Sequence, residues 1–327
     1  MQRFVARPIY RPDNEELRFL PECPRMLRNL PGRAPVLGWV NIQHAAAAPV
    51  GSINLLNLTT GQNTNSPLPG RPGFFVETDR PGVLLIGLER RLVLFDLVSA
   101  RLVETGVTLR DDERVIINDG IAIPGGLLFG TKHLEFREPI ASLYHLDAES
   151  KKLTQLVTGE ICSNGKYFVR EADGAVLIEI DSQPKTITRY RLDCGPTFGG
   201  KGFGRALEPS LVVAPSALPA FPDGLRPTPS GESIVVAFYN PEAVDTGLAQ
   251  EIRLADGAVL TEWLFPGSPR VTCPEFVRLD GQVRLIFTTA TEGMPPEIRA
   301  IAGEAGTMFC ADTAFETMPE APPLVNW

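Results

Sequence analysis

The chain carries two apolar stretches in close succession, VLLIGL at residues 83–88 and LVLFDL at residues 92–97. Side chains of a β-strand alternate between two faces, so an unbroken apolar run indicates a strand that is covered on both faces. The second stretch contains the polar Asp96 near its end, and Ser99 follows two residues beyond Leu97, as polar residues often do at a turn after a strand. The pair therefore predicts two neighbouring strands of a largely buried β-sheet.

Similar pairs recur along the chain, each with an apolar stretch followed by a more alternating one that ends near Asp, Asn or Gly. They lie at residues 36–42 and 52–61, 126–131 and 141–147, 175–180 and 186–193, and 233–238 and 249–257, with a last apolar stretch at 283–289. The units follow one another every roughly 40–60 residues, the period of propeller blades with about four strands. We expect an all-β, six-bladed β-propeller in which each apolar stretch is an inner strand.

The repeated units fill the chain, so we expect residues 1–327 to form a single propeller domain. Spacing alone leaves one alternative, a two-domain β-sandwich. The segment near 194–222 lacks the repeated pattern and is predicted to be an insertion loop around the channel entrance. Residues 318–327 are rich in proline and are predicted to form an extended C-terminal tail.

The charge of the chain argues against two classes of partner. The net charge is −8, and no basic stripe is present to neutralise the phosphates of nucleic acids or anionic membranes. Residues 1–11 contain no apolar segment of signal-peptide length, and no run approaches the ~18 apolar residues of a membrane-spanning helix. We therefore expect a cytoplasmic protein whose partner is a small molecule.

Four short polar segments stand next to apolar stretches in different units. They contain Glu22, Asn118, Asn164 and Asp223. Taken singly, the Asn-Gly and Asp-Gly pairs among them are ordinary turn signatures. The blades of a propeller converge on a central channel, where residues that are distant in sequence can meet. Two carboxylates and one or two amides there suit one hard divalent cation such as calcium, magnesium or manganese, with zinc as a further option.

Five segments in order along the chain carry a family resemblance. They are ECP at residues 22–24, NDGIAIPGGLLFGT at 118–131, SNG at 163–165, FPDGL at 221–225 and TCP at 272–274. Together they resemble the gluconolactonase/regucalcin family, also called senescence marker proteins, which includes luciferin-regenerating enzymes. The match extends over nearly the whole chain. It implies a six-bladed β-propeller with a metal site in the central channel.

The resemblance also implies roles for individual residues. Glu22, Asn164 and Asp223 would bind the metal, with calcium as the first choice of ion. Asp223 would also be the general base, and Asn118 would lie nearby and bind the substrate. The family places a substrate-binding arginine before the Asn-Asp-Gly segment, and the nearest one here is Arg114, separated from Asn118 by three residues.

Two residues depart from the family pattern at a place where they can affect substrate choice. Lys132 and His133 follow Gly130-Thr131, where the family often has a methionine. They would lie near the channel mouth, and we predict that they contact the substrate.

These features predict a metal-dependent hydrolase that opens a small, sugar-like lactone by attack of a metal-activated water. Two alternatives stay open. One is a hydrolase of another ester or a phosphotriester at the same site, and the other is a non-catalytic propeller that binds a metal or a metabolite.

Overall fold

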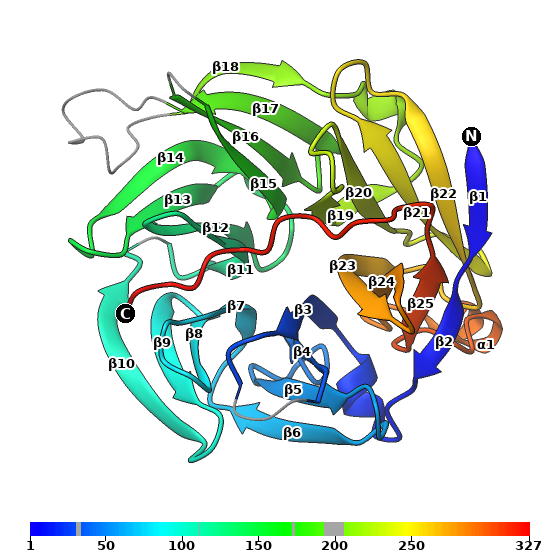
Figure 1. Ribbon diagram of the computed structural model, residues 1–327, viewed down its shortest axis with the longest axis horizontal. Helices are drawn as coiled ribbons and strands as arrows, with labels where there is room; N and C mark the ends of the chain where they lie inside the picture. The colour runs from blue at the N-terminus through cyan, green and yellow to red at the C-terminus, as the bar shows by residue number, and fades with distance from the viewer. Residues whose placement is uncertain (31–33, 111, 172–173, 193–205) are drawn as a thin grey trace. The chain divides into compact units, whose positions relative to one another are not determined.

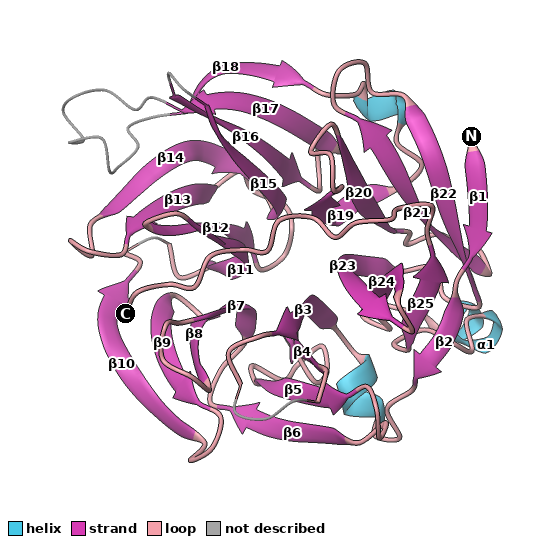
Figure 2. Cartoon of the chain, in the orientation of Figure 1, coloured by secondary structure: helices cyan, strands magenta, loops and turns pink. Residues whose placement is uncertain are grey.

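Strands dominate the protein, as the cartoon in Figure 2 shows. The computed structural model describes residues 1–30, 34–110, 112–171, 174–192 and 206–327. Helical structure in this part of the chain comprises the 3-10 turns η1 (Glu15–Arg18) and η3 (Pro215–Ala217) and the short helix α1 (Pro296–Ile301). No helix among the described residues is long and apolar enough to cross a membrane.

The chain divides into two compact units, each with three sheets. Unit 1 comprises residues 1–27, 33–72 and 216–321, and unit 2 comprises residues 28–32, 73–215 and 322–327. The strands within each sheet are labelled in Figure 1. Neighbouring strands that follow each other in the chain pair antiparallel, as expected for strands joined by short turns.

In unit 1, the first sheet has the order β3-β4-β5-β6. Its strands are β3 (Pro21–Leu27), β4 (Val36–Asn41), β5 (Gly51–Asn57) and β6 (Asn63–Leu68). The second sheet contains β19 (Phe221–Pro227), β20 (Ser233–Tyr239), β21 (Thr246–Arg253) and β22 (Val259–Pro266). The third contains β23 (Val271–Leu279), β24 (Gln282–Thr289) and β25 (Met308–Asp312).

The N-terminal segment completes two of these sheets. Strand β1 (Gln2–Val5) adds to β22 as a parallel fifth strand, and β2 (Arg7–Tyr10) pairs antiparallel with β25 as a fourth strand. The first residues of the chain thus lie against strands that are more than 200 positions away, a pairing that no local pattern could indicate.

In unit 2, each sheet takes its strands in chain order. The first contains β7 (Pro72–Glu77), β8 (Val83–Leu88), β9 (Arg91–Asp96) and β10 (Arg101–Thr108). The second contains β11 (Val115–Ile123), β12 (Gly126–His133), β13 (Ala141–Asp147) and β14 (Leu153–Glu160). The third contains β15 (Ser163–Glu171), β16 (Gly174–Asp181), β17 (Thr186–Leu192) and β18 (Ala206–Leu211).

The apolar stretches form the second strands of the sheets, and the expectation that they are the inner strands was wrong. They correspond to β4, β8, β12, β16, β20 and β24. First strands contact first strands between neighbouring sheets, β3 with β23 and β19 with β23 in unit 1, and β11 with β15 in unit 2. Second strands also contact the neighbouring sheet, as β20 does with β23 and β12 with β15. Those first strands carry the polar residues.

Packing between neighbouring sheets explains why the second strands are apolar throughout. In unit 1, Leu37 and Trp39 of β4 pack against Val277 and Ile286 of the β23–β25 sheet. In unit 2, Leu128 of β12 belongs to a cluster that also contains Leu177 of β16, so the β11–β14 sheet packs against the β15–β18 sheet. A strand with a sheet on either side is buried on both faces, and each large side chain buried there stabilises the fold by about 1.5–3 kcal/mol.

The predicted insertion near 194–222 contains regular structure. Residues 206–211 form β18, whose partner is the edge of β17, with Leu192 opposite Ala206 and Thr188 opposite Leu211. The residues between them, 193–205, lie outside the described part of the chain. The fourth strand of this sheet therefore falls inside the segment, where the sequence shows no apolar run because most of β18 is exposed.

The end of the C-terminal tail is extended and lies along unit 2. Val325 donates its backbone N–H to the carbonyl of Glu77 at 3.0 Å and accepts from Asp79 at 2.9 Å, just beyond the end of β7. The Val325 side chain is buried, and the ring of Trp327 lies 3.5 Å from the Lys151 ammonium. Figure 1 shows this segment as the red trace that ends at the label C.

Candidate active site

The predicted polar residues of unit 1 lie on first strands where the strand pairing shifts. On β3 the register with β4 shifts between Glu22 and Arg25. On β19 the register with β20 shifts between Pro222 and Leu225, around Asp223. Such a β-bulge adds an unpaired residue to one strand and re-aims the side chains at that point.

Unit 2 has the same feature on two first strands. The register of β11 with β12 shifts between Ile117 and Gly120, around Asn118, and that of β15 with β16 shifts between Asn164 and Lys166. Bulges are over-represented next to active sites. Glu22, Asn118, Asn164 and Asp223 therefore all lie at or beside a β-bulge. No feature of the sequence indicated these bulges.

The glycines beside these residues allow neighbouring strands to pack closely. The interpretation of the Asp-Gly pairs as turn signatures was wrong, because both pairs lie within strands. A Cβ at Gly224 would lie 2.5 Å from Cys273 Sγ, and one at Gly120 would lie 2.7 Å from the ring of Phe74. Both glycines lie within strands, and their φ angles are not positive. Each glycine marks a place where one first strand meets the next.

The negative charges of Glu22 and Asp223, the two carboxylates of unit 1, both raise the pKa of one phenol, that of Tyr239. Asp223 is 6% exposed. Burial raises the pKa of the Tyr239 phenol, and the negative charges of Glu292, Asp223 and Glu22 raise it further. Both carboxylates therefore lie close to Tyr239, although they are 201 positions apart in the sequence.

A buried ion-pair network ties the strands that carry these carboxylates. Arg226 of β19 donates from Nε to Glu275 of β23 at 2.8 Å and from Nη2 to the carbonyl of Pro24 on β3 at 3.1 Å. Arg25 of β3 also donates to Glu275, at 3.4 Å. Burial opposes the charge of Arg226, but its anionic neighbours raise its pKa overall. The network fixes β3 and β19 relative to β23.

The two amides of unit 2 are fixed by hydrogen bonds. Asn118 Nδ2 donates to the carbonyl of Ser163 at 3.0 Å, which links β11 to β15. Asn164 Nδ2 donates to Ser182 Oγ at 3.2 Å, and Lys166 Nζ donates to the Asn164 carbonyl at 2.7 Å. Both amides are 6% exposed. Their NH2 groups are engaged with the protein, and Asn164 Oδ1 accepts from the backbone N–H of Gly165 at 3.2 Å. An amide oxygen has two lone pairs, so one that accepts a hydrogen bond can still face a cation.

Buried acids that the sequence analysis missed surround Lys166. Ser163 Oγ donates to Glu179 Oε1 at 2.5 Å, and burial together with the neighbouring Glu160 raises the pKa of Glu179 well above its ordinary value. Among the described residues, neither oxygen of Glu160 has a fixed donor, and a proton on Glu179 would supply one. A signal did exist, because Glu179 is the one charged residue within the apolar stretch 175–180.

Comparison with known proteins places this fold and these residues in a family. The sequence model of the SMP-30/gluconolactonase/LRE-like region matches residues 20–291. The chain belongs to this family. The matched range contains every site residue predicted from the sequence, and the family resemblance is thereby confirmed.

Relatives within and around the SMP-30/gluconolactonase/LRE-like family agree with this assignment. An L-arabinolactonase of Azospirillum brasilense is 28% identical over 259 residues, 78% of this chain and 79% of that protein. The structure of a calcium-binding regucalcin from Agrobacterium tumefaciens superposes with a TM-score of 0.78 at 20% identity, covering 100% of both chains. A luciferin-regenerating enzyme gives a TM-score of 0.76 at 18% identity, covering 99% of this chain and 100% of that one. The predicted six-bladed β-propeller is confirmed.

Three of the four residues predicted to contact the substrate, Arg114, Lys132 and His133, lie at one end of the β11–β12 pair. Lys132 stands opposite Ile116, and His133 opposite Val115. The Lys132 ammonium lies 5.3 Å from the centre of the Phe136 ring, and the Arg114 side chain is half exposed and pairs with Asp112 and Glu138. His133 is buried, and its Nδ1 accepts from the backbone N–H of Arg137 at 3.0 Å. Their contact with substrate stays a prediction.

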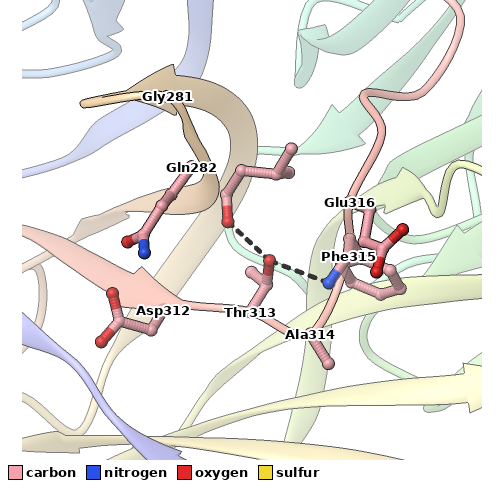
Figure 3. A pocket seen from close by; sticks show the side chains of 8 residues that line it. Gly281, Gln282, Asp312, Thr313, Ala314, Phe315 and Glu316 are labelled. Carbon is pink, nitrogen blue, oxygen red and sulfur yellow. Dashed lines mark hydrogen bonds between the residues drawn. The ribbon is translucent and has the colours of Figure 1, made fainter.

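Two cavities lie away from these residues. One of about 570 Å³ in unit 1 is lined by residues of the β23–β24 turn and of the segment after β25, where Thr313 Oγ1 donates to the Val283 carbonyl at 2.6 Å (Figure 3). One of about 650 Å³ in unit 2 is lined by the β11–β12 turn and by Trp327. Neither contains a site residue that the family resemblance implies.

Proposed function

We propose that this chain is a metal-dependent lactonase that opens a small, sugar-like lactone. The observation that carries the proposal is the pair of carboxylates Glu22 and Asp223, which lie at register shifts on two first strands of unit 1. Membership of the SMP-30/gluconolactonase/LRE-like family and the similarity to an L-arabinolactonase support it. L-arabinolactone is accordingly the first substrate to test.

The proposed ligands suit a divalent cation by their chemistry. Two carboxylates and the amide oxygen of Asn164 are hard oxygen donors, which calcium prefers, and manganese, magnesium and zinc remain alternatives. Asp223 is buried beside a second acid, and buried like charges are costly unless a cation offsets them. In unit 1, Arg25 and Arg226 are directed to Glu275. A divalent cation bound by Glu22 and Asp223 would offset the charge of the two acids.

The side chains then divide the work of hydrolysis. When bound, the cation would polarise the lactone carbonyl and make an attacking water more acidic. Asp223 would accept a proton from the attacking water and return it to the ring oxygen as the acyl C–O bond of the lactone breaks. Glu22 and Asn164 are proposed as further ligands of the cation. Asn118, Arg114, Lys132 and His133 are proposed to orient the lactone. The protein is expected to act on a small molecule, and its cytoplasmic location remains a prediction.

Metal removal and one isosteric substitution test this function. Purified protein is stripped of metal and assayed on L-arabinolactone and other sugar lactones, with calcium, manganese, magnesium or zinc added back. We expect one cation to restore turnover, and Asp223→Asn to lower kcat by at least about 100-fold because it removes the base. The matched control is Asp280→Asn, since Asp280 is 87% exposed in its side chain and pairs only at the surface with Arg284.

Turnover that is unaffected by metal removal, or that survives in Asp223→Asn, would contradict the mechanism. Turnover of simple esters or phosphotriesters in place of lactones would move the assignment to the first alternative. Tight cation binding without turnover of any substrate would favour the binding role, which the calcium-binding regucalcin neighbour suggests.

A further inference from the structure

Tyr239 and Arg270 lie beside Asp223 in unit 1, and neither was singled out in the sequence. Tyr239 ends β20 and stands opposite Phe221, two positions before Asp223. Arg270 directly precedes β23 and pairs with Tyr239 through an isolated antiparallel bridge. The two residues therefore lie at the end of these sheets where β19 begins, close to Asp223.

The side chains of the pair share one acceptor. Tyr239 Oη donates to the backbone carbonyl of Glu292 at 2.7 Å, and Arg270 Nη1 donates to the same carbonyl. The Arg270 guanidinium also lies 5.1 Å from the centre of the Tyr239 ring. The carbonyl is itself held, because the backbone N–H of Glu292 donates to Phe19 at 2.9 Å. The phenol and the guanidinium are thus fixed relative to each other.

The Nε atom of Arg270 has no hydrogen-bond partner among the residues that the structure describes. Arg270 is 2% exposed, and its Nε is a buried donor. Buried donors in folded proteins are nearly always satisfied, by protein, water or a ligand. Leaving one unpaired costs free energy comparable to a lost hydrogen bond. The atom therefore points to a bound oxygen.

Gly293 keeps space open next to the pair. Its φ is +60°, and a Cβ there would lie 3.6 Å from Arg270 Nη1 and 3.9 Å from Tyr239 Oη. A larger side chain at this position would occupy the volume over both polar groups. The exposed Gly293 leaves that volume to solvent or to a ligand.

The two free polar functions are complementary in kind. The Tyr239 phenol donates its proton to the Glu292 carbonyl, so its oxygen offers lone pairs to a ligand. Arg270 Nε offers an N–H. A hydroxyl group both donates and accepts, and it matches this acceptor and this donor together. An ester or ether oxygen can only accept, and it matches one of them.

We propose that Tyr239 and Arg270 form a hydroxyl-binding subsite beside Asp223, which selects hydroxylated lactones over unsubstituted ones. The inference rests on the proposed lactonase function and specifies its substrate class. Tyr239 contacts the substrate hydroxyl. Arg270 holds the phenol ring and donates to the same hydroxyl oxygen.

Kinetics with two lactones test the subsite. Tyr239→Phe keeps the ring and removes the phenol oxygen. For L-arabinolactone we expect KM to rise roughly tenfold with kcat little changed, since one hydrogen bond made equally in ground and transition states is lost. For γ-butyrolactone, which has no hydroxyl group, kcat/KM should be unchanged. Arg270→Lys, which keeps the charge but lacks the Nε–H, should give the same selective loss.

A binding experiment judges the subsite independently of turnover. The probe is a hydroxylated cyclic ether, 1,4-anhydroarabinitol, which has the hydroxyl groups but no lactone carbonyl. Calorimetry should show roughly tenfold weaker binding to Tyr239→Phe than to the wild-type protein. The control is Tyr10→Phe, a partly buried tyrosine of the same unit that lies on β2, which should bind as the wild type does.

The outcomes separate the two proposals. If the wild type turns over no lactone, the proposed function fails, and the binding experiment still decides the subsite. Equal losses for both lactones, or equal binding of the probe to wild type and Tyr239→Phe, would overturn the subsite. Unchanged thermal unfolding of Tyr239→Phe confirms that a selective loss does not come from misfolding.

Discussion

At the scale of single residues, the site depends on how buried charge is compensated. In unit 2, Lys166 is almost fully buried and donates to the Asn164 carbonyl. Its charge lowers the pKa of both Glu160 and Glu179, while burial raises the pKa of each more strongly. Burial and the neighbouring Glu160 raise the pKa of Glu179, which favours its protonated form beside the single ammonium of Lys166. This arrangement makes the unit sensitive to pH.

The pH dependence of stability follows from that proton. The pKa of Glu179 in the folded protein is raised well above that of an ordinary glutamate, mainly by burial. Its contribution to stability is therefore complete below the pKa of an ordinary glutamate and is lost as pH rises towards the folded pKa. Glu179→Gln stays neutral and keeps an acceptor for Ser163. Between about pH 5 and about pH 8, the free energy of unfolding of the wild type, measured with urea, should fall relative to that of Glu179→Gln.

The control for this prediction is Glu104→Gln, which removes an exposed acid that pairs with Arg91 at the surface. It should run parallel to the wild type over the same pH range. If Glu179→Gln also ran parallel to the wild type, Glu179 would be ionised in the folded protein, and the shared proton would be excluded.

At the scale of elements, the first strands carry function and the second strands carry stability. The second strands are buried on both faces, and their apolar runs predicted their position in the sequence correctly. The apolar runs of the first strands are interrupted by polar side chains, which lie at or beside β-bulges. Their glycines allow neighbouring first strands to approach closely.

Gly224→Ala tests the close approach of β19 to β23. The added Cβ would lie 2.5 Å from Cys273 Sγ and 2.8 Å from Cys273 Cα, so the strands must move apart. We expect the variant to lose about 1–3 kcal/mol of unfolding free energy and to lose turnover, because Asp223 is the preceding residue. Urea unfolding and the lactone assay measure the two effects.

The matched control is Gly303→Ala, at a glycine whose Cβ would meet no atom within 4 Å and whose φ is not positive. It should leave both stability and turnover close to those of the wild type. A Gly224→Ala protein of normal stability and activity would show that the contact with Cys273 is not tight in solution.

At the scale of the whole molecule, the fold is completed by pairings between distant parts of the chain. Strand β2 fills the fourth place of the β23–β25 sheet, and β1 extends the β19–β22 sheet. Phe4 of β1 stacks on Trp263 with ring centres 6.3 Å apart, and Tyr10 of β2 lies 5.9 Å from Trp39. Both sheets belong to unit 1, which also holds Glu22 and Asp223.

Removal of residues 1–11 should therefore destabilise unit 1. The deletion would expose the edges of β22 and β25 and remove their hydrogen bonds, at a cost of at least about 3 kcal/mol in unfolding free energy. Scanning calorimetry should show a lower midpoint for the deletion variant. Arg3→Ala, which breaks only the surface pair with Glu262, should leave the midpoint nearly unchanged. An unaltered midpoint in the deletion variant would show that β1 and β2 do not contribute to stability.

The sequence by itself determined the blade count, the positions of the apolar strands, the family and the polar residues that the family resemblance assigns to a metal. These features are local or periodic, and burial of apolar side chains writes them directly into the residue pattern. Only the tertiary structure decided which strand of each sheet meets its neighbours, where the N-terminal strands pair, and that Asp-Gly marks close packing. It alone brought Arg270 and Tyr239 beside Asp223. Such contacts join residues tens to hundreds of positions apart, and no local pattern records which distant strand a residue will face.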